Sequence, residues 1–285
     1  NTMANKGLEV CLIGCEGKEG RPFYPLDSNV IFKNLGIDYH VCITDKLKSM
    51  IYMNRSKRRE MREYFCAKRV SAKLENVIKE FSPDIFFAND LKSAFALKKV
   101  LHSYIPTVYI MHGNPKHVLN DCPISLGVLE SLELVCVLLP DYIDVVNDIL
   151  EKHNLKSIQM IAVPNKVPSY EVCNSRREER IIHLGRIDSD SKKQFTLVRA
   201  FGLIAAKYRD WSVHFYGPVD RNNKAYLEDM LSYIKSNNLD QQIFFHKSVD
   251  NVKAVLDQGS IFAFPSANEG FPLALTEAMS SGLAC

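Results

Sequence analysis

Short runs of apolar and β-branched residues alternate with segments of helical periodicity along most of this chain. Strands that are separated by helices normally join a parallel sheet, so the alternation predicts an α/β protein whose parallel sheets are covered on both faces. The expected strands are residues 8–13, 39–44, 84–88, 107–111, 134–139, 158–163, 181–184, 212–216, 243–246 and 261–264. The longest expected helix, residues 58–81, ends where Ser82-Pro83 stops it.

A proline-bounded segment divides the pattern into two halves. Pro164-Asn165-Lys166-Val167-Pro168 interrupts the alternation, and a highly polar stretch follows it. We therefore expect two doubly wound domains, residues 1–163 and residues 164–285. The chain begins with asparagine, and a further strand starts just after Gly282, so we expect a fragment whose second domain is incomplete.

Composition excludes several classes of protein. With 46% hydrophobic and 24% charged residues, the 285-residue chain is typical of a soluble globular protein. The formal charge of +3 does not call for a nucleic-acid partner. No membrane-spanning stretch or leader sequence is evident, which favours the cytoplasm, and the eight cysteines include no Cys-x-x-Cys pair, which favours reduced core residues.

Two segments of the second half carry chemistry. In the first, an apolar strand leads through Pro265 and Glu269 into a helix that contains Glu277. The start of such a helix presents unpaired N–H groups, which suit a phosphate, although a loop carboxylate and a dipole partner explain the same residues. In the second, the strand 181–184 leads into Gly185-Arg186 and a loop, after which Lys192 opens a helix.

Together these segments resemble the donor-binding domain of retaining glycosyltransferase family 4. The matching residues are Gly185-Arg186, Lys192, Ala200-Phe201, Phe264-Pro265-Ser266 and the run from Glu269 to Met279. The resemblance covers most of residues 160–285 and is weaker before them, where strand order and Met111-His112-Gly113 match. It implies the GT-B fold, in which two Rossmann-like domains face a cleft, the first on the acceptor side and the second binding the donor.

The resemblance also implies roles for single residues. Arg186 and Lys192 would neutralise the donor diphosphate, Glu269 would contact the transferred sugar, and Glu277 would hold the ribose. His112 would reach the donor sugar from the first domain, although a structural turn histidine is the alternative, and His117 has no comparable claim. The remaining donor-binding candidates are Gly185, Gly270, Phe271 and Leu273, with Gly14 and Gly17 in place of the family's paired glycines. The loop before Lys192 is one residue longer than the common form, which leaves Lys193 as an alternative.

No metal or other cofactor is expected. Asp188-Ser189-Asp190 mimics an Asp-x-Asp metal motif, but cationic residues surround it, and helix capping by Asp190 or Ser191 is the simpler use. In this family a leaving phosphate oxygen is thought to accept the proton of the acceptor, so the two glutamates are not the carboxyl pair of a glycosidase.

The leading hypothesis is transfer of a hexosyl unit, with retention, from a nucleotide-diphosphate sugar to a saccharide or lipid-linked acceptor. A dehydrogenase would need a Gly-x-Gly-x-x-Gly turn, which is missing. A GT-B sugar-nucleotide epimerase and a non-catalytic nucleotide-sugar-binding relative stay open as alternatives. The basic run in residues 55–69 is either a solvated face or a peripheral contact with anionic lipid at the inner face of the plasma membrane.

Overall fold

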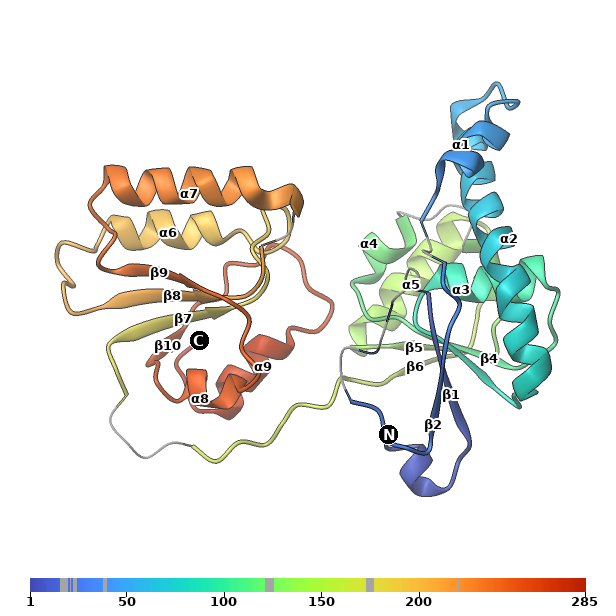
Figure 1. Cartoon of the computed structure of the whole chain (residues 1–285), viewed down its shortest axis with the longest axis horizontal. Coiled ribbons are helices and arrows are strands. Elements are labelled where there is room, and N and C mark those ends of the chain that lie inside the picture. Colours follow the sequence, from blue (N-terminus) through green and yellow to red (C-terminus); the bar gives the residue numbers. More distant parts are fainter. Residues whose placement is uncertain are drawn as a thin grey trace. The chain divides into compact units, whose positions relative to one another are not determined.

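The computed structural model describes residues 1–15, 20, 22, 25–37, 40–120, 126–172, 177–219 and 221–285. These residues form two compact units, 1–163 and 164–285. Each unit is an α/β structure in which all the paired strands run parallel (Figure 1). The fold class predicted from the alternation is confirmed.

The first unit contains a four-stranded sheet and a separate pair of strands. The sheet consists of β3 (Phe86–Ala88), β4 (Thr107–Ile110), β5 (Leu134–Val137) and β6 (Met160–Ala162), in that order. The separate parallel pair is β1 (Val10–Gly14) and β2 (Val30–Asn34). Tyr109 on β4 and Val135 on β5 are opposite each other and both buried, so they belong to the core of this unit.

Helices cover the strands of the first unit. They are α1 (Ile43–Ser49), α2 (Arg55–Phe81), α3 (Leu91–Phe95), α4 (Pro115–Asn120) and α5 (Asp141–Lys152), with shorter turns at Ala4–Lys6, Ala96–Val100 and Leu126–Ser131. Helix α2 begins after Asn54, whose Oδ1 accepts hydrogen bonds from the N–H groups of Ser56 and Lys57. Val70 and Leu74, four positions apart on α2, are buried together with Leu97 in a second core cluster.

The strand predicted at residues 39–44 is wrong. Tyr39 lies outside the described residues, whereas Cys42 precedes α1 and Ile43 is its first residue. The Asp45 carboxylate accepts a hydrogen bond from the backbone N–H of Cys42 at 3.0 Å, which closes a capping box and starts a helix where the apolar run suggested a strand. The second strand of this unit is β2, which the sequence analysis missed.

The second unit has one four-stranded sheet between two layers of helices. Its strands are β7 (Arg180–Leu184), β8 (Ser212–Tyr216), β9 (Ile243–His246) and β10 (Ile261–Phe262), and their order is β10-β7-β8-β9. Helices α6 (Gln194–Gly202) and α7 (Lys224–Ser236) cover one face, and α8 (Val252–Leu256) and α9 (Leu273–Ser280) cover the other (Figure 1). A short turn, Arg221–Asn223, precedes α7.

This strand order creates a topological switch point between β7 and β10. The chain leaves β7 through α6 toward β8, whereas β10 continues into α9 on the opposite face. In open parallel sheets, ligands bind outside the carboxyl ends of the strands at such a point. The fold therefore directs attention to the loops that follow these two strands.

The end of the described chain extends the same sheet. Gly282, with φ of 76°, follows α9, and Ala284 forms a parallel bridge with Ile261 of β10. The strand start predicted after Gly282 is thus confirmed as a bridge. Among the helices of the described residues, none is long and apolar enough to cross a bilayer.

Candidate active site

The two motif loops of the sequence meet at the switch point of the second unit. Gly185 follows β7 directly, and Ala263 follows β10. The backbone N–H of Ala267 donates a hydrogen bond to the carbonyl oxygen of Ser191 at 2.8 Å, which joins the loop after β10 to the loop after β7. Segments 76 positions apart in the sequence, at Ser191 and Ala267, therefore form one surface.

Lys192 and Glu269 form an ion pair across this junction. Lys192 Nζ lies 2.6 Å from Glu269 Oε1, and each side chain is 21% exposed. The same ammonium lies 5.8 Å from the centroid of the Phe264 ring, within the range of a cation–π contact. The structure thus brings together a cation and a carboxylate that the sequence analysis had given separate roles. Lys192 lies in the loop, because α6 begins at Gln194 and not at Lys192 as expected.

Arg186 is fixed at one end and open to solvent at the other. Its Nε donates a hydrogen bond to Asp188 Oδ2 at 3.0 Å, and its Nη2 lies 3.0 Å from the same oxygen in an ion pair, while 58% of its side chain is exposed. Burial alone would raise the pKa of Asp188. The N–H groups of Ser191 and Asp190 and the Arg186 guanidinium outweigh burial, so the pKa lies below its usual range. The guanidinium is therefore oriented by a carboxylate that stays charged.

The expected capping role of Asp190 or Ser191 is wrong. The residue before α6 is Lys193, which has φ of 53° and no side-chain cap. Asp188 Oδ1 instead accepts from the N–H groups of Asp190 and Ser191, at 2.8 and 2.9 Å, and closes a tight turn. Within the described ranges, no three His, Cys, Asp or Glu side chains are grouped so that they could hold a metal ion.

A buried histidine and a buried glutamine connect both loops beneath the surface. His183 Nδ1 lies 3.0 Å from the carbonyl oxygen of Ala263, and His183 Nε2 lies 3.1 Å from Gln194 Nε2. Gln194 Nε2 also donates to the carbonyl oxygen of Arg186 at 2.7 Å, and Gln194 Oε1 accepts from the N–H of Asp188 at 3.1 Å. We call these two residues, both 0% exposed, the His183–Gln194 network. The partners assign the Nδ1–H tautomer to a neutral His183.

Stability should fall in acid because of buried histidines. Burial lowers the pKa of His183 and of His214 from 6.5 to about 4, and it also lowers the pKa of His246, which is 2.9 Å from His214. Between pH 6.5 and about pH 4 the unfolded chain binds more protons than the folded protein, so the free energy of unfolding decreases as the pH falls. We expect His183 alone to contribute a loss of about 2–3 kcal/mol from about pH 7 to about pH 4.5.

Urea denaturation at a series of pH values measures the slope of the free energy of unfolding against pH. His214→Phe should flatten it, and replacement of the exposed His153 by phenylalanine is the matched control. Equal slopes in the two variants would contradict the assignment.

The remaining predicted residues of this unit lie on the loop before α9 and on α9 itself. Gly270 and Phe271 lie in the loop, Leu273 is the first residue of α9, and Glu277 lies one turn further along. Burial raises the pKa of Glu277. This carboxyl group is partly buried and faces less water than one on an open helix surface.

Close backbone contact at the strand ends requires a glycine that the sequence analysis missed. Gly217 follows β8 with φ of 152°, and a Cβ built on it would lie 2.2 Å from the carbonyl oxygen of Gly185. No side chain fits there unless the loop that carries Arg186 moves. The Gly217-Pro218 pair just after a strand was the available signal.

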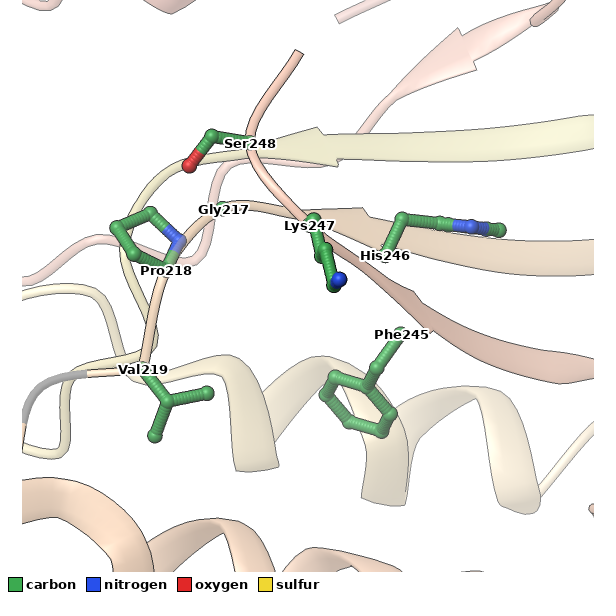
Figure 2. A pocket seen from close by; sticks show the side chains of 7 residues that line it. All are labelled: Gly217, Pro218, Val219, Phe245, His246, Lys247 and Ser248. Carbon is green, nitrogen blue, oxygen red and sulfur yellow. The ribbon is translucent and has the colours of Figure 1, made fainter.

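An open pocket of about 500 Å³ lies at the same edge of the sheet. It is lined by residues 217–219 after β8 and residues 245–248 at the end of β9 (Figure 2). Phe245, Pro218 and Val219 give it an apolar wall, and Lys247 and Ser248 supply polar groups. All four strands end at this edge because they are parallel, so the pocket and the two motif loops share it.

The candidates of the first unit belong to a separate group. His112 follows β4 and is exposed, with its Nε2 3.3 Å from Asn89 Oδ1 beyond the end of β3. Gly14 ends β1, and a Cβ there would lie 3.1 Å from the Phe32 ring. Gly17 lies outside the described residues. His112 and Gly14 thus lie at the carboxyl ends of strands, as predicted, and their contact with a donor stays a prediction.

Comparison with known proteins agrees with this arrangement. Residues 178–285 match the family described as glycosyl transferases group 1. The chain is also 23% identical over 292 aligned positions to an uncharacterized glycosyltransferase of Haemophilus influenzae, an alignment that covers 99% of this chain and 72% of the relative.

Solved structures show the same fold. A UDP-forming α,α-trehalose-phosphate synthase from Burkholderia xenovorans matches with a TM-score of 0.71 and 14% identity, over 98% of this chain and 78% of that one. A mutant of S. aureus TarM, in complex with fondaparinux, α-GlcNAc-glycerol and UDP, matches with a TM-score of 0.59 and 16% identity. That alignment covers 75% of this chain, which spans 44% of TarM. Residues 178–285 therefore match the group 1 glycosyltransferase family and the chain has the GT-B fold, and both findings agree with the resemblance seen in the sequence.

Proposed function

We propose that this protein transfers a hexosyl unit, with retention and without a metal, from a nucleotide-diphosphate sugar to a saccharide or lipid-linked acceptor. The observation that carries the proposal is the junction of Arg186, Lys192 and Glu269 at the switch point of a group 1 glycosyltransferase domain. Two cations, a carboxylate and a helix start meet there, which is the set of groups that a sugar diphosphate needs.

The cations explain how such a site would accelerate transfer. Breaking the anomeric bond places charge on the departing diphosphate, so positive groups aimed at it stabilise the transition state more than the ground state. Arg186 supports this role because Asp188 fixes one edge of its guanidinium, while much of the side chain is exposed. Orientation by Asp188 reduces the entropy that is lost when a phosphate is bound.

Lys192 and Glu269 suit a shared role in donor binding. An ammonium group has three N–H donors, and a bond to Glu269 Oε1 leaves others for a phosphate oxygen. Glu269 carries a carboxylate, a group whose oxygens accept hydrogen bonds from sugar hydroxyls. We propose that Lys192 contacts the diphosphate next to Glu269, and that Glu269 contacts the transferred sugar, which couples recognition of the two parts of the donor.

The other predicted residues complete the proposed donor site. Glu277 would accept hydrogen bonds from the ribose, and Gly185, Gly270, Phe271 and Leu273 would bring backbone groups close to the donor. His112, Gly14 and Gly17 would contribute from the first domain, which we assign to the acceptor side. Asp188 is engaged by Arg186 and by two backbone N–H groups, which supports independence from metal.

The nucleotide of the donor and the location of the protein are further parts of the proposal. UDP is bound in the TarM structure, so UDP-sugars are the first donors to test. The open pocket beside the motif loops offers room for the uncharged part of a nucleotide. We further propose that the protein works in the cytoplasm, where residues 55–69 contact anionic lipid at the inner face of the plasma membrane.

A binding and turnover screen tests the proposed function. Purified protein is incubated with UDP-, GDP- and ADP-sugars, with and without chelator, and compared with Glu269→Ala. We expect one donor class to bind and to release its nucleotide slowly, with no effect of chelator and with turnover lost in the variant. Binding without nucleotide release, even with acceptor saccharides present, would favour the non-catalytic relative. No binding of any nucleotide sugar would overturn the proposal.

A further inference from the structure

Helix α1 (Ile43–Ser49) buries two polar side chains, Asp45 and Ser49, against the protein and exposes its apolar side chains to solvent. Asp45 and Ser49 are 2% and 0% exposed, whereas Ile43 and Leu47, one helical turn apart, are 73% and 59% exposed. Surface helices of globular proteins normally have the opposite arrangement. The reversal indicates that the apolar face of α1 serves a purpose outside the core.

Charged hydrogen bonds hold α1 in this reversed orientation. Arg69 Nη2 donates to Asp45 Oδ2 at 3.3 Å, and Arg62 Nε donates to Ser49 Oγ at 3.0 Å. Arg58 Nε donates to the carbonyl oxygen of Tyr52 at 3.1 Å, which fixes the loop between α1 and α2. Three cationic side chains of α2 therefore point inward and anchor the segment, so its outward face is a built surface.

The exposed apolar face continues into that loop. Met50, Ile51 and Met53 are 61%, 77% and 92% exposed. Single exposed apolar residues are common, but a group of this size in so short a segment marks an interaction site. We call this group the α1 surface; it consists of Ile43, Leu47, Met50, Ile51 and Met53.

Positive charge surrounds the α1 surface. The exposed flanking cations are Lys46, Lys48, Arg55 and Arg59; Lys57 is exposed as well, but its Nζ lies 2.7 Å from Glu60 Oε1. In residues 40–60 of the sequence the acidic residues are Asp45, which is buried and paired with Arg69, and Glu60, which is paired with Lys57. An apolar centre within a cationic border complements a surface that is negative outside and apolar beneath.

We propose that the α1 surface docks on an anionic lipid bilayer. Its apolar side chains would enter the boundary between headgroups and acyl chains, while the flanking lysines and arginines contact lipid phosphates. A symmetric contact between two copies of this chain is disfavoured because it would bring two cationic borders together.

The α1 surface lies beside the predicted basic run, residues 55–69, and supplies the strongly exposed apolar side chains that this run lacks. In residues 55–69 the aromatic side chains of Tyr64 and Phe65 are partly buried, so the strongly exposed apolar groups come from residues 43–53. Docking at α1 does not depend on the transfer reaction, since none of its residues belongs to the proposed donor site.

Co-sedimentation with vesicles tests the proposal. Vesicles of phosphatidylcholine, with and without phosphatidylglycerol, are mixed with the wild-type protein at low and high salt. We compare Ile43→Ser/Leu47→Ser/Ile51→Ser with Lys46→Glu/Lys48→Glu/Arg55→Glu. We expect binding to the anionic vesicles alone, a drop of about tenfold or more in both variants, and weaker binding at high salt. Leu203→Ser/Tyr104→Ser, at side chains that are 86% and 97% exposed elsewhere, is the matched control and should bind normally.

Two results would overturn the proposal. One is equal vesicle binding by the wild-type protein and the Ser variant, which would leave the apolar face without a role. The other is a wild-type protein that binds no anionic vesicle and becomes monomeric only when the Ser substitutions are made, which would assign the face to a second copy. Unchanged melting temperature and nucleotide-sugar binding show that the variants are folded and separate this test from that of the proposed function.

Discussion

Replacement of Arg186 by alanine should lower kcat about a hundredfold to a thousandfold, with a smaller change in KM for the donor. The guanidinium is an exposed cation at the switch point, and Asp188 orients it through one hydrogen bond of 3.0 Å from Nε and an ion pair with Nη2. A group that meets charge developing on the leaving diphosphate acts mainly in the transition state, so its loss appears in kcat. Steady-state kinetics with the donor identified in the screen measures both constants.

Two further variants make the result for Arg186 specific. Arg186→Lys keeps the charge but loses the planar fork and the paired contact with Asp188, so its activity should lie between wild type and alanine. Arg209→Ala removes an exposed cation from the loop between α6 and β8, at the opposite edge of the sheet, and should leave both constants unchanged. If Arg186→Ala raised KM with an unchanged kcat, the residue would bind the donor without acting on the transition state.

Replacement of Gln194 by leucine should lower the free energy of unfolding by roughly 3–5 kcal/mol. Leucine has a similar volume, but it leaves His183 Nε2, the Arg186 carbonyl and the Asp188 N–H buried without the partner they have now. Since two of these groups belong to the loop that carries the cations, donor affinity should fall as well. Urea denaturation and donor titration check the two effects.

Gln194→Glu distinguishes the effect of the hydrogen bonds in the His183–Gln194 network from the effect of side-chain packing. A carboxylate beside His183 Nε2 favours the imidazolium, so the pKa of His183 should rise from its value of about 4, as a histidine titration by NMR would record. The matched control is Gln242→Leu, because Gln242 is partly exposed and its amide bonds only backbone carbonyls; it should cost about 1 kcal/mol or less. Equal losses for Gln194→Leu and Gln242→Leu would show that the buried network adds no special stability.

The alternation of strands and helices determined much of the architecture by itself. Strand periodicity depends on neighbouring residues, so the strands at 212–216 and 243–246 were predicted with the bounds that the structure has. The two loops with Arg186, Lys192 and Glu269 were also evident, because short motifs are local. Their meeting at one sheet edge follows from the parallel arrangement of strands.

The tertiary structure determined the interactions between residues that are far apart in the sequence. Lys192 and Glu269 are 77 positions apart, and their ion pair exists because β7 and β10 are neighbours. In the sequence Gln194 is an ordinary polar residue near the start of a helix. In the folded chain its side-chain amide forms hydrogen bonds with His183, Arg186 and Asp188, which come together only when the helix packs on the sheet.

Helix α1 gives the clearest case of a local pattern that misled. The apolar run at residues 39–44 suggested a strand, but α1 starts at Ile43, and Asp45 and Ser49 face inward because arginines of α2 meet them there. The sequence determines which residues are apolar and how they are spaced. Which face of an element turns inward depends on the groups that the folded chain sets against it, and here those groups are charged.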